Sequence, residues 1–405
     1  MFTEDESITT RAGNTLGVTS TEQTVIDQYR GADKWKGLLP SVKDDETNPR
    51  KWDEGFRSFL LKYGALNHVV YDVFIMGEDD AKDEDGLRGT SRFKDDLEAF
   101  TRRGLKFRYR NKLGETKTEY DFTEDYHIIG NMVCSPRSFF TAEDNWFGFI
   151  ALSNDKKEMV IVFRGTETTK EWVENATVLM EQLDGEEPES GFALFWNHKQ
   201  LMVHRGFQQL YCQESMEGCE SPKAAVHRLI GEHKDTVEAI TVLGHSLGGA
   251  VCQLAGTDIA HSGVAGDIPV TVISWASPKF GNAAMAARVQ ELHPRLRILR
   301  IKNPIDSVAN MPPDWLWSLT AGGYRHVGTE LILSNTNLHK RGVLKADGGN
   351  SSNHNLQMYL HCIDPSRDVA LMNKVGDVIP NVYCNKHKIS PAWHSQTWPR
   401  TFYEA

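Results

Sequence analysis

A serine between two glycines is the residue best placed to do chemistry in this chain. Ser246 lies in the pattern G-x-S-x-G, after an apolar run that is typical of a buried strand and before small residues that favour a helix. A strand that turns into a helix this abruptly strains its turn residue and points the hydroxyl away from the sheet, while glycines leave room for the backbone. The hydroxyl would lie at the N-terminus of a helix beginning at Leu247, where N–H groups favour developing negative charge. The pattern predicts a nucleophile, and a glycine-rich turn that serves packing alone is the alternative.

A serine hydroxyl reacts well only when a base takes its proton and an acid orients that base. In known folds with a G-x-S-x-G elbow, the chain order of the triad is serine, acid, histidine. Catalytic groups lie at the carboxyl ends of the parallel strands, so the acid should follow a strand and the histidine should follow the acid. Asp306 meets the first condition, because it comes five residues after the predicted strand 296–301. A turn aspartate that caps its own backbone is the alternative reading. Asp267 and Asp314 compete with it, although neither directly follows a convincing strand end.

The histidine is harder to choose, because the chain has fifteen. His326 lies in a strand-like segment, and His339 lies in a basic turn. His354 and His361 are seven residues apart and would share a face if their segment were helical. His245 adjoins the serine, but the turn would point it away, so we interpret it as structural. Spacing alone leaves the base open.

An acyl-transfer site also needs donors for the oxyanion. The residues Phe163-Arg164-Gly165-Thr166 end a predicted strand, and the glycine lets the backbone approach a substrate closely. The N–H and hydroxyl of Thr166 can donate, and with the N–H of Leu247 they would form an oxyanion hole. A strand-terminating β-turn is the alternative.

The elements that must position these residues alternate between strand and helix from Trp146 onward. Strands separated by helices of ten to fifteen residues give βαβ units, so the sequence predicts an α/β fold with a mostly parallel central sheet. The predicted strands are 146–152, 159–163, the apolar run before Ser246, 270–275 and 296–301; the predicted helices begin at Pro222, at Leu247 and at about Ala283.

The chain divides into two tails and one predicted domain. Residues 1–28 are polar and Thr-rich and predict a loose N-terminal tail, whereas residues 376–405 predict an irregular wrapping tail. Residues 29–375 are interpreted as a single domain whose first part, 29–145, is a helical N-terminal layer. The helical spacing on which this layer rests is that of Phe56, Phe59, Leu60 and Tyr63.

Charge excludes several classes of partner. The net charge of −10, without a long Lys/Arg run, argues against nucleic acid and against a polybasic grip on anionic lipid. No run approaches the roughly eighteen apolar residues that a transmembrane helix needs. The first residues, Met1-Phe2-Thr3-Glu4-Asp5-Glu6, lack the basic and apolar regions of a secretion signal, which predicts a cytoplasmic protein. Any contact with a membrane would be made by apolar side chains.

Two groups of motifs recur in order along the chain. The first group is Gly244–Ala250, Val162–Thr166 and Val203–Phe207; the second is Glu171-Trp172, His354–His361 and Arg367–Lys374. The first group resembles the motifs of the class 3 (fungal-lipase-like) lipases, and the second resembles the plant-type phospholipase A1 branch of that family. The resemblance covers about residues 28 to 395.

The resemblance implies an α/β-hydrolase fold and hydrolysis of acyl esters, commonly at the sn-1 position of a glycerolipid such as a phospholipid, galactolipid or acylglycerol. It implies Ser246 as nucleophile, Asp306 as orienting acid and His354 as base, with Thr166 and Leu247 as oxyanion donors. This chemistry requires no metal and no cofactor. A transient peripheral contact with a membrane or lipid droplet is expected.

Residues 167–203 lie where the family places its lid. Lids sequester a reaction and open to bind, and aromatic side chains sit well at a lipid interface. The side chains expected to enter that interface, called here the apolar lid set, are Phe192, Leu194, Phe195 and Trp196. A packed surface loop is the alternative. Two other functions stay open: a soluble carboxylesterase or acyltransferase on the same fold, and an inactive lipid-binding or regulatory protein.

Overall fold

A seven-stranded mixed sheet lies at the centre of the part of the chain that the structure describes. The structure is a computed structural model, and it describes residues 53–79, 105–110, 116–134, 145–165, 179–186, 200–215, 218–304, 306–312, 323–333 and 354–364. The strands of the sheet are β3 (Tyr126–Cys134), β4 (Asn145–Ser153), β5 (Glu158–Phe163), β8 (Ala239–His245), β9 (Val270–Trp275), β11 (Leu296–Lys302) and β13 (Thr329–Ile332). Their spatial order is β13-β11-β9-β8-β5-β4-β3.

Five neighbouring strands of this sheet run parallel. β5 pairs with β8, β8 with β9, β9 with β11 and β11 with β13 in parallel, whereas β3, β4 and β5 pair antiparallel. Every strand predicted from the sequence is present in this sheet, with bounds that differ by at most two residues. The prediction of an α/β fold with a mostly parallel sheet is therefore confirmed.

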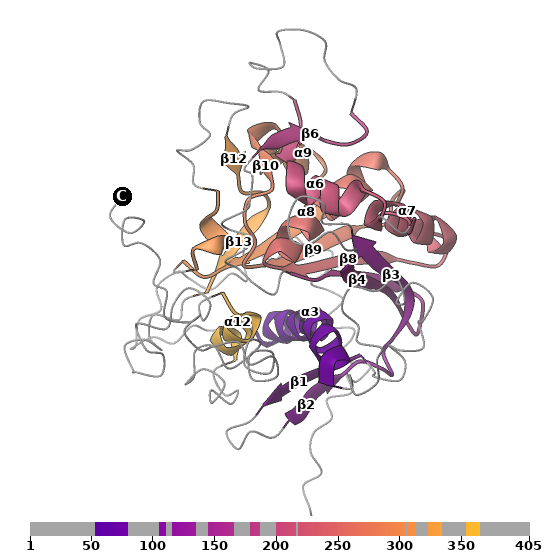
Figure 1. Ribbon diagram of the computed structural model, residues 1–405, viewed down its shortest axis with the longest axis vertical. Coiled ribbons are helices and arrows are strands. Elements are labelled where there is room, and N and C mark those ends of the chain that lie inside the picture. Colours follow the sequence, from indigo (N-terminus) through magenta and orange to yellow (C-terminus); the bar gives the residue numbers. More distant parts are fainter. Residues whose placement is uncertain are drawn as a thin grey trace, which may run out of the picture.

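Helices cover both faces of the sheet (Figure 1). On one face lie α6 (Arg205–Cys212), α7 (Pro222–His233), α8 (Leu247–Ser262) and α9 (Ala283–Glu291). On the other lie α3 (Glu54–Asp79) and α12 (Leu356–Ile363). Asp53 caps α3 by accepting from the amide of Phe56, and Ser221 caps α7 by accepting from the amide of Ala224, as the sequence predicts for α7.

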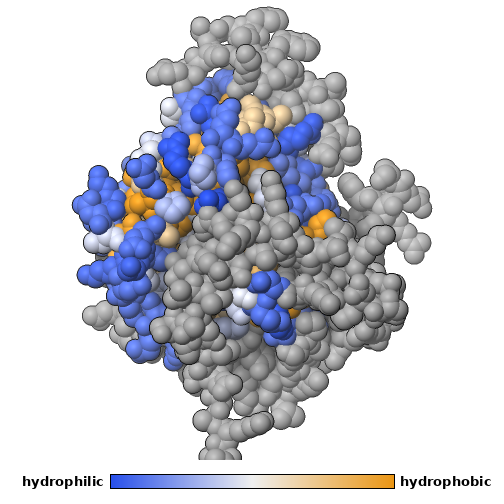
Figure 2. All heavy atoms as spheres, turned by 180° about the vertical axis from the view of Figure 1, so that it is seen from behind, coloured by the Kyte–Doolittle hydropathy of each residue, from blue (hydrophilic) through white to orange (hydrophobic). Residues whose placement is uncertain are grey.

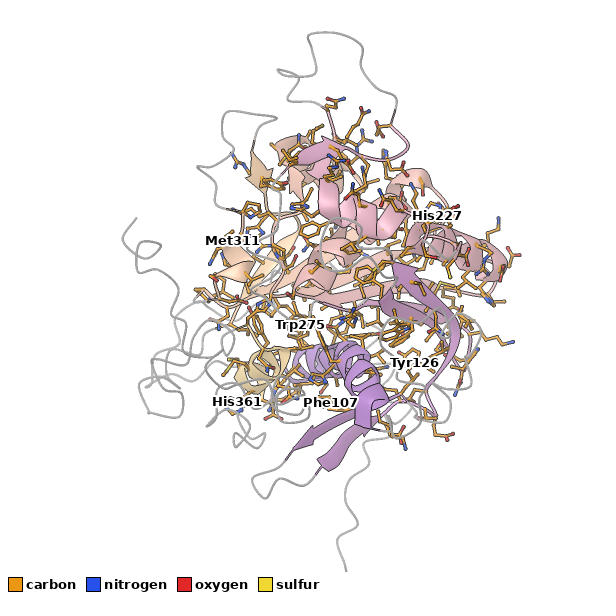
Figure 3. The ribbon with its side chains drawn as sticks, in the orientation of Figure 1. Phe107, Tyr126, His227, Trp275, Met311 and His361 are labelled. Carbon is orange, nitrogen blue, oxygen red and sulfur yellow. The ribbon has the colours of Figure 1, made fainter. Side chains whose placement is uncertain are left out.

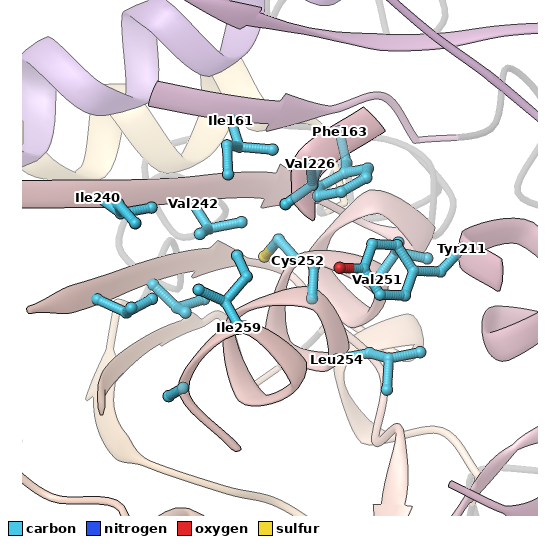
Figure 4. Packing of buried hydrophobic residues seen from close by; sticks show 14 of the residues in the cluster. Ile161, Phe163, Tyr211, Val226, Ile240, Val242, Val251, Cys252, Leu254 and Ile259 are labelled. Carbon is cyan, nitrogen blue, oxygen red and sulfur yellow. The ribbon is translucent and has the colours of Figure 1, made fainter. Parts of the chain in front are cut away.

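The alternation of side chains along each strand divides the core into two layers. Ile161 and Val242 face the α8 layer, where they meet Val251 and Ile259 (Figure 4). The adjacent residues on these strands point to the opposite face of the sheet and pack against α3 and α12; Val160, Val162 and Leu243 are examples. Strands buried on both faces read as continuous apolar runs, which is why they were visible in the sequence.

Two smaller sheets complete the described part. One has the order β12-β10-β7-β6, and the other pairs β1 with β2. Their strands are β6 (Met180–Gln182), β7 (Met202–His204), β10 (Gly281–Asn282), β12 (Tyr324–Arg325), β1 (Lys106–Arg110) and β2 (Thr116–Asp121). The described part of the region 29–145 thus contains β1, β2 and β3 besides the helix that the sequence predicts. The division into one domain and two tails stays a prediction, and both tails lie outside the described residues.

None of the helices in the described ranges is long and apolar enough to cross a membrane. On the face shown in Figure 2, hydrophilic residues dominate the described surface, with hydrophobic side chains in patches between them. Among the described residues, Leu179 is the large hydrophobic residue whose side chain is exposed, at 46%. It immediately precedes β6.

Candidate active site

Ser246 occupies a strained turn between a strand and a helix. β8 ends at His245 and α8 begins at Leu247, so Ser246 alone makes the turn, with φ 60° and ψ −128°. A Cβ at position 244 would lie 2.0 Å from the carbonyl oxygen of Gly248, and a Cβ at position 248 would lie 2.6 Å from that of Phe163. Only glycine fits at either position. Positive φ at a non-glycine residue persists where the surroundings impose it, as at a nucleophile elbow.

A histidine and a carboxylate reach Ser246 from two other elements. The Nε2 atom of His354 lies 2.7 Å from the Oγ of Ser246, and its Nδ1 atom lies 2.8 Å from the Oδ2 of Asp306. Asp306 follows β11, and His354 immediately precedes the N-cap of α12. The exposed fractions are 4% for Ser246, 5% for His354 and 0% for Asp306, so these hydrogen bonds form away from bulk water.

The carboxylate of Asp306 is held by two further donors. The hydroxyl of Tyr359 donates to Oδ2 at 2.7 Å, and the amide of Val308 donates to Oδ1 at 3.0 Å. The same hydroxyl accepts from the amide of Asn303 at 3.0 Å. Burial and then the Asp306 charge raise the pKa of Tyr359 well above its ordinary value, so the hydroxyl keeps its proton and donates. Trp275, whose ring meets that of Tyr359 edge to face, lies between the sheet and the α3–α12 layer (Figure 3).

The competing residues lie elsewhere. Asp267 is exposed in the turn between α8 and β9, at the amino ends of the parallel strands. His326 follows β12, and burial lowers its pKa to about 2. His361 is buried within α12. Asp314 and His339 lie outside the described residues. Among the candidates in the described part of the chain, Asp306 and His354 are therefore the acid and the histidine that tertiary packing brings to Ser246.

One of the two predicted oxyanion donors belongs to the described residues. Leu247 is the first residue of α8, and the first N–H groups of a helix have no acceptor within it. The turn after β5 packs on the same elbow, because a Cβ at Gly165 would lie 3.2 Å from the Cβ of Ser246. Thr166 lies outside the described residues, so its part in an oxyanion hole stays a prediction.

A short ladder joins β6, which lies within the predicted lid region 167–203, to β7 at the end of that region. β6 pairs antiparallel with β7, with Met180 opposite His204. The apolar lid set lies outside the described residues, and the lid stays a prediction. Within the described ranges, no group of three or more His, Cys, Asp or Glu side chains could hold a metal ion.

Comparison with known proteins shows what this chain is similar to. Residues 160–315 match the family model described as lipase (class 3). The chain is 27% identical over 412 residues to phospholipase A1-II 4 from Oryza sativa subsp. japonica, a match covering 93% of each chain. It is 28% identical over 433 residues to the chloroplastic phospholipase A1-Igamma2 from Arabidopsis thaliana, covering 93% of this chain and 74% of the relative.

Among solved structures, the chain is similar to the triacylglyceride lipase of Rhizomucor miehei. The identity is 24%, the match covers 53% of this chain and 69% of that chain, and the TM-score is 0.39. At that score the comparison adds nothing to the sheet topology described above.

Sequence reasoning missed two residues that contact the candidate site. The hydroxyl of Tyr359, on α12, contacts Asp306, and that of Tyr71, on α3, contacts His245 beside Ser246. The sequence marked Tyr359 only by its place in the family-like stretch His354–His361. His245 was interpreted as structural, and it does point away from the Ser246 hydroxyl, into contacts with Tyr71 and His354.

Proposed function

We propose that this chain is a serine acylhydrolase that cleaves the acyl esters of glycerolipids, with sn-1 (phospholipase A1-type) hydrolysis as the main reaction. The observation that supports it best is the hydrogen-bond chain from Ser246 Oγ through His354 to Asp306, built on a strand–turn–helix elbow. The chain order of serine, acid and histidine is that of α/β-hydrolases. The phospholipase A1 names of the relatives support the substrate class.

The proposed reaction has two halves. Ser246 Oγ attacks the ester carbonyl carbon while His354 Nε2 takes the hydroxyl proton, and Asp306 stabilises the imidazolium that forms. The amide of Leu247, with Thr166 as the second proposed donor, stabilises the oxyanion. The tetrahedral intermediate collapses, and His354 returns the proton to the leaving glycerol oxygen of the lysolipid. Water then gives its proton to His354 and attacks the acyl-enzyme, which releases a fatty acid and restores the Ser246 hydroxyl.

We also propose a transient contact with a lipid surface. The apolar lid set is the segment suited to it, and the exposed Leu179 at the base of the predicted lid region adds an apolar side chain there. The net charge of −10 favours neutral or zwitterionic lipids over anionic ones. A cytoplasmic location stays a prediction, since one of the two relatives named above is chloroplastic; imaging of the tagged full chain tests it.

The test is hydrolysis by the purified full chain of vesicles or micelles of phosphatidylcholine, galactolipid and diacylglycerol labelled separately at sn-1 and sn-2. We expect release of the sn-1 acyl chain, labelling of Ser246 by a fluorophosphonate, and loss of both in Ser246→Ala. Ser262→Ala, an exposed serine at the end of α8, is the matched control and should behave as wild type. Activity that survives in Ser246→Ala would disprove the proposed mechanism. A folded wild type that hydrolyses nothing and resists the fluorophosphonate would favour the inactive lipid-binding alternative.

A further inference from the structure

His245, which the proposed reaction does not use, is buried against the proposed base. Its ring centroid lies 4.9 Å from that of His354, and its Nε2 atom lies 2.7 Å from the backbone carbonyl oxygen of His354. A carbonyl oxygen only accepts, so Nε2 carries a proton and donates it. Burial and then the neighbouring His354 hold the pKa of His245 well below its ordinary value, so the ring is neutral. Its Nδ1 atom is therefore an acceptor.

The donor to Nδ1 comes from the opposite layer of the fold. The hydroxyl of Tyr71, on α3, lies 2.7 Å from His245 Nδ1, and burial raises the pKa of that hydroxyl, so it keeps its proton and donates. The oxygen of Tyr71 also accepts from the amide of Gly165 at 3.2 Å. The hydrogen bonds thus form one continuous chain. The Gly165 amide donates to Tyr71, the Tyr71 hydroxyl donates to His245 Nδ1, and His245 Nε2 donates to the His354 carbonyl oxygen.

This hydrogen-bond chain connects two parts of the site whose relative positions matter for the proposed reaction, the Gly165 turn and the His354 backbone. Gly165 belongs to the turn that leads to the proposed oxyanion donor Thr166, and its amide is committed to Tyr71 instead of substrate. Space at that turn is tight, since a Cβ at Gly165 would lie 2.3 Å from the Tyr71 hydroxyl and 2.8 Å from the carbonyl oxygen of His245. At the other end, the same chain fixes the backbone of His354, whose ring must meet Ser246.

A neutral His245 also suits the proposed reaction. His354 becomes positively charged when it takes the serine proton, and a second charge 4.9 Å away would oppose that step. The donation from Tyr71 occupies the lone pair at which His245 would gain its proton.

We propose that Tyr71 and His245 are positioning residues, which hold the His354 backbone and the Gly165 turn in the geometry that acyl transfer needs. This rests on the proposed function. Displacement of a reacting group by about 1 Å can cost about 100-fold in rate, so removal of the hydroxyl in Tyr71→Phe should lower kcat on a soluble p-nitrophenyl ester by roughly 10- to 100-fold, with KM within about twofold.

Tyr63→Phe is the matched control. Tyr63 lies two turns earlier on the same helix, is also buried, and donates its hydroxyl to Glu158 at 2.7 Å. Glu158 is the first residue of β5, whereas Ser246 follows the carboxyl end of the parallel neighbour β8. Loss of the Tyr63 hydroxyl should therefore lower the melting temperature as Tyr71→Phe does and leave kcat within about twofold of wild type.

A second pair of variants acts on His245 and leaves α3 unchanged. In His245→Gln the side-chain amide can still donate to the His354 carbonyl oxygen, whereas in His245→Ala no donor remains. We therefore expect a roughly tenfold higher kcat in His245→Gln than in His245→Ala. Equal kcat in these two variants, or wild-type kcat in Tyr71→Phe with Ser246→Ala inactive, would overturn the positioning role and leave the proposed function standing. Activity in Ser246→Ala would instead remove the proposed function itself.

Discussion

Substitution of Asp306 by asparagine should disable this enzyme without unfolding it, because the two carboxylate oxygens have different partners. Oδ2 accepts from both His354 and Tyr359, and Oδ1 accepts from the amide of Val308. A carboxylate can accept at both oxygens, but an amide has one accepting end and one donating end. Each of the two orientations of the new side chain therefore loses a different set of hydrogen bonds.

In the first orientation the carbonyl oxygen stays on Val308 and the NH₂ group faces His354. The NH₂ group donates to Nδ1, the ring proton moves to Nε2, and Nε2 meets Ser246 as a donor that cannot take a proton. Loss of the correct tautomer in a serine triad costs roughly 10⁴-fold in kcat, about 5.4 kcal/mol. In the other orientation the NH₂ group opposes the Val308 amide, which leaves a buried donor unsatisfied at a cost of about 1–3 kcal/mol of stability.

In the first orientation the Tyr359 hydroxyl faces the NH₂ group and loses its acceptor, so both orientations cost some stability. We expect the first one, because it keeps the backbone bond that forms the loop. We expect kcat to fall by about 10³- to 10⁴-fold, with a parallel fall in the fluorophosphonate rate and a melting temperature within a few degrees of wild type. Asp267→Asn, in an exposed turn, is the control and should keep full activity. A variant of Asp306 that retains more than a tenth of wild-type kcat would refute the role assigned to this carboxylate.

Three other outcomes follow from named contacts. Tyr359→Phe removes a donor to Asp306 and the acceptor of the Asn303 amide, so urea unfolding should show a loss of about 1–3 kcal/mol, and kcat should fall far less than in Asp306→Asn. Burial lowers the pKa of His204 in the folded chain to about 4, whereas the same side chain in the unfolded chain has a pKa of about 6.5. Between these two values the unfolded chain binds a proton at His204 and the folded chain does not. The free energy of unfolding therefore falls as the pH drops from about 6.5 to about 4. His204→Asn keeps a capping acceptor for α6 and should remove about 2 kcal/mol of the stability lost between pH 7.5 and 5; an unchanged loss would show that His204 does not titrate this way. Serine at all four positions of the apolar lid set should abolish activation by micelles and spare short soluble esters, whereas equal losses on both substrates would count against the lid.

The elements that the sequence predicted are those with a strong local pattern. β9 and β11 are continuous apolar or alternating runs, and α7 begins with a serine cap and a proline. Several of the strands it missed are short or polar: β10 has two residues, and β2 reads Thr-Lys-Thr-Glu-Tyr-Asp. The nine-residue β3 was missed as well; it is an edge strand of the central sheet, and Gly130 interrupts its apolar run. Such segments form strands because a neighbour offers them an edge, which no window of their own residues records.

The site divides in the same way. The turn at Ser246 is encoded within five residues, and Asp306 could be placed because it follows a strand. The base could not be chosen by spacing, since His354 is one of fifteen histidines and lies 108 residues from Ser246. Tyr71 is 174 residues from His245, and a buried tyrosine on a helix face has the pattern of any core residue. Such contacts become visible only when the layers are packed.

The layer formed by α3 and α12, on the face of the sheet opposite α8, therefore helps to position the proposed catalytic residues. The match to the class 3 family model covers residues 160–315 and includes Ser246 and Asp306, whereas His354 and Tyr71 lie outside it. The segment that carries His354 is held by close packing of α12 on α3, where a Cβ at Gly64 would lie 2.3 Å from a methyl carbon of Leu360. A fragment limited to the matched residues would keep the proposed nucleophile and acid but would lack the proposed base and the helices that place it. Packing thus links α3 to the proposed reaction, and substitutions at the positions of α3 that contact α12 or the elbow, Gly64 and Tyr71, should change kcat as well as stability.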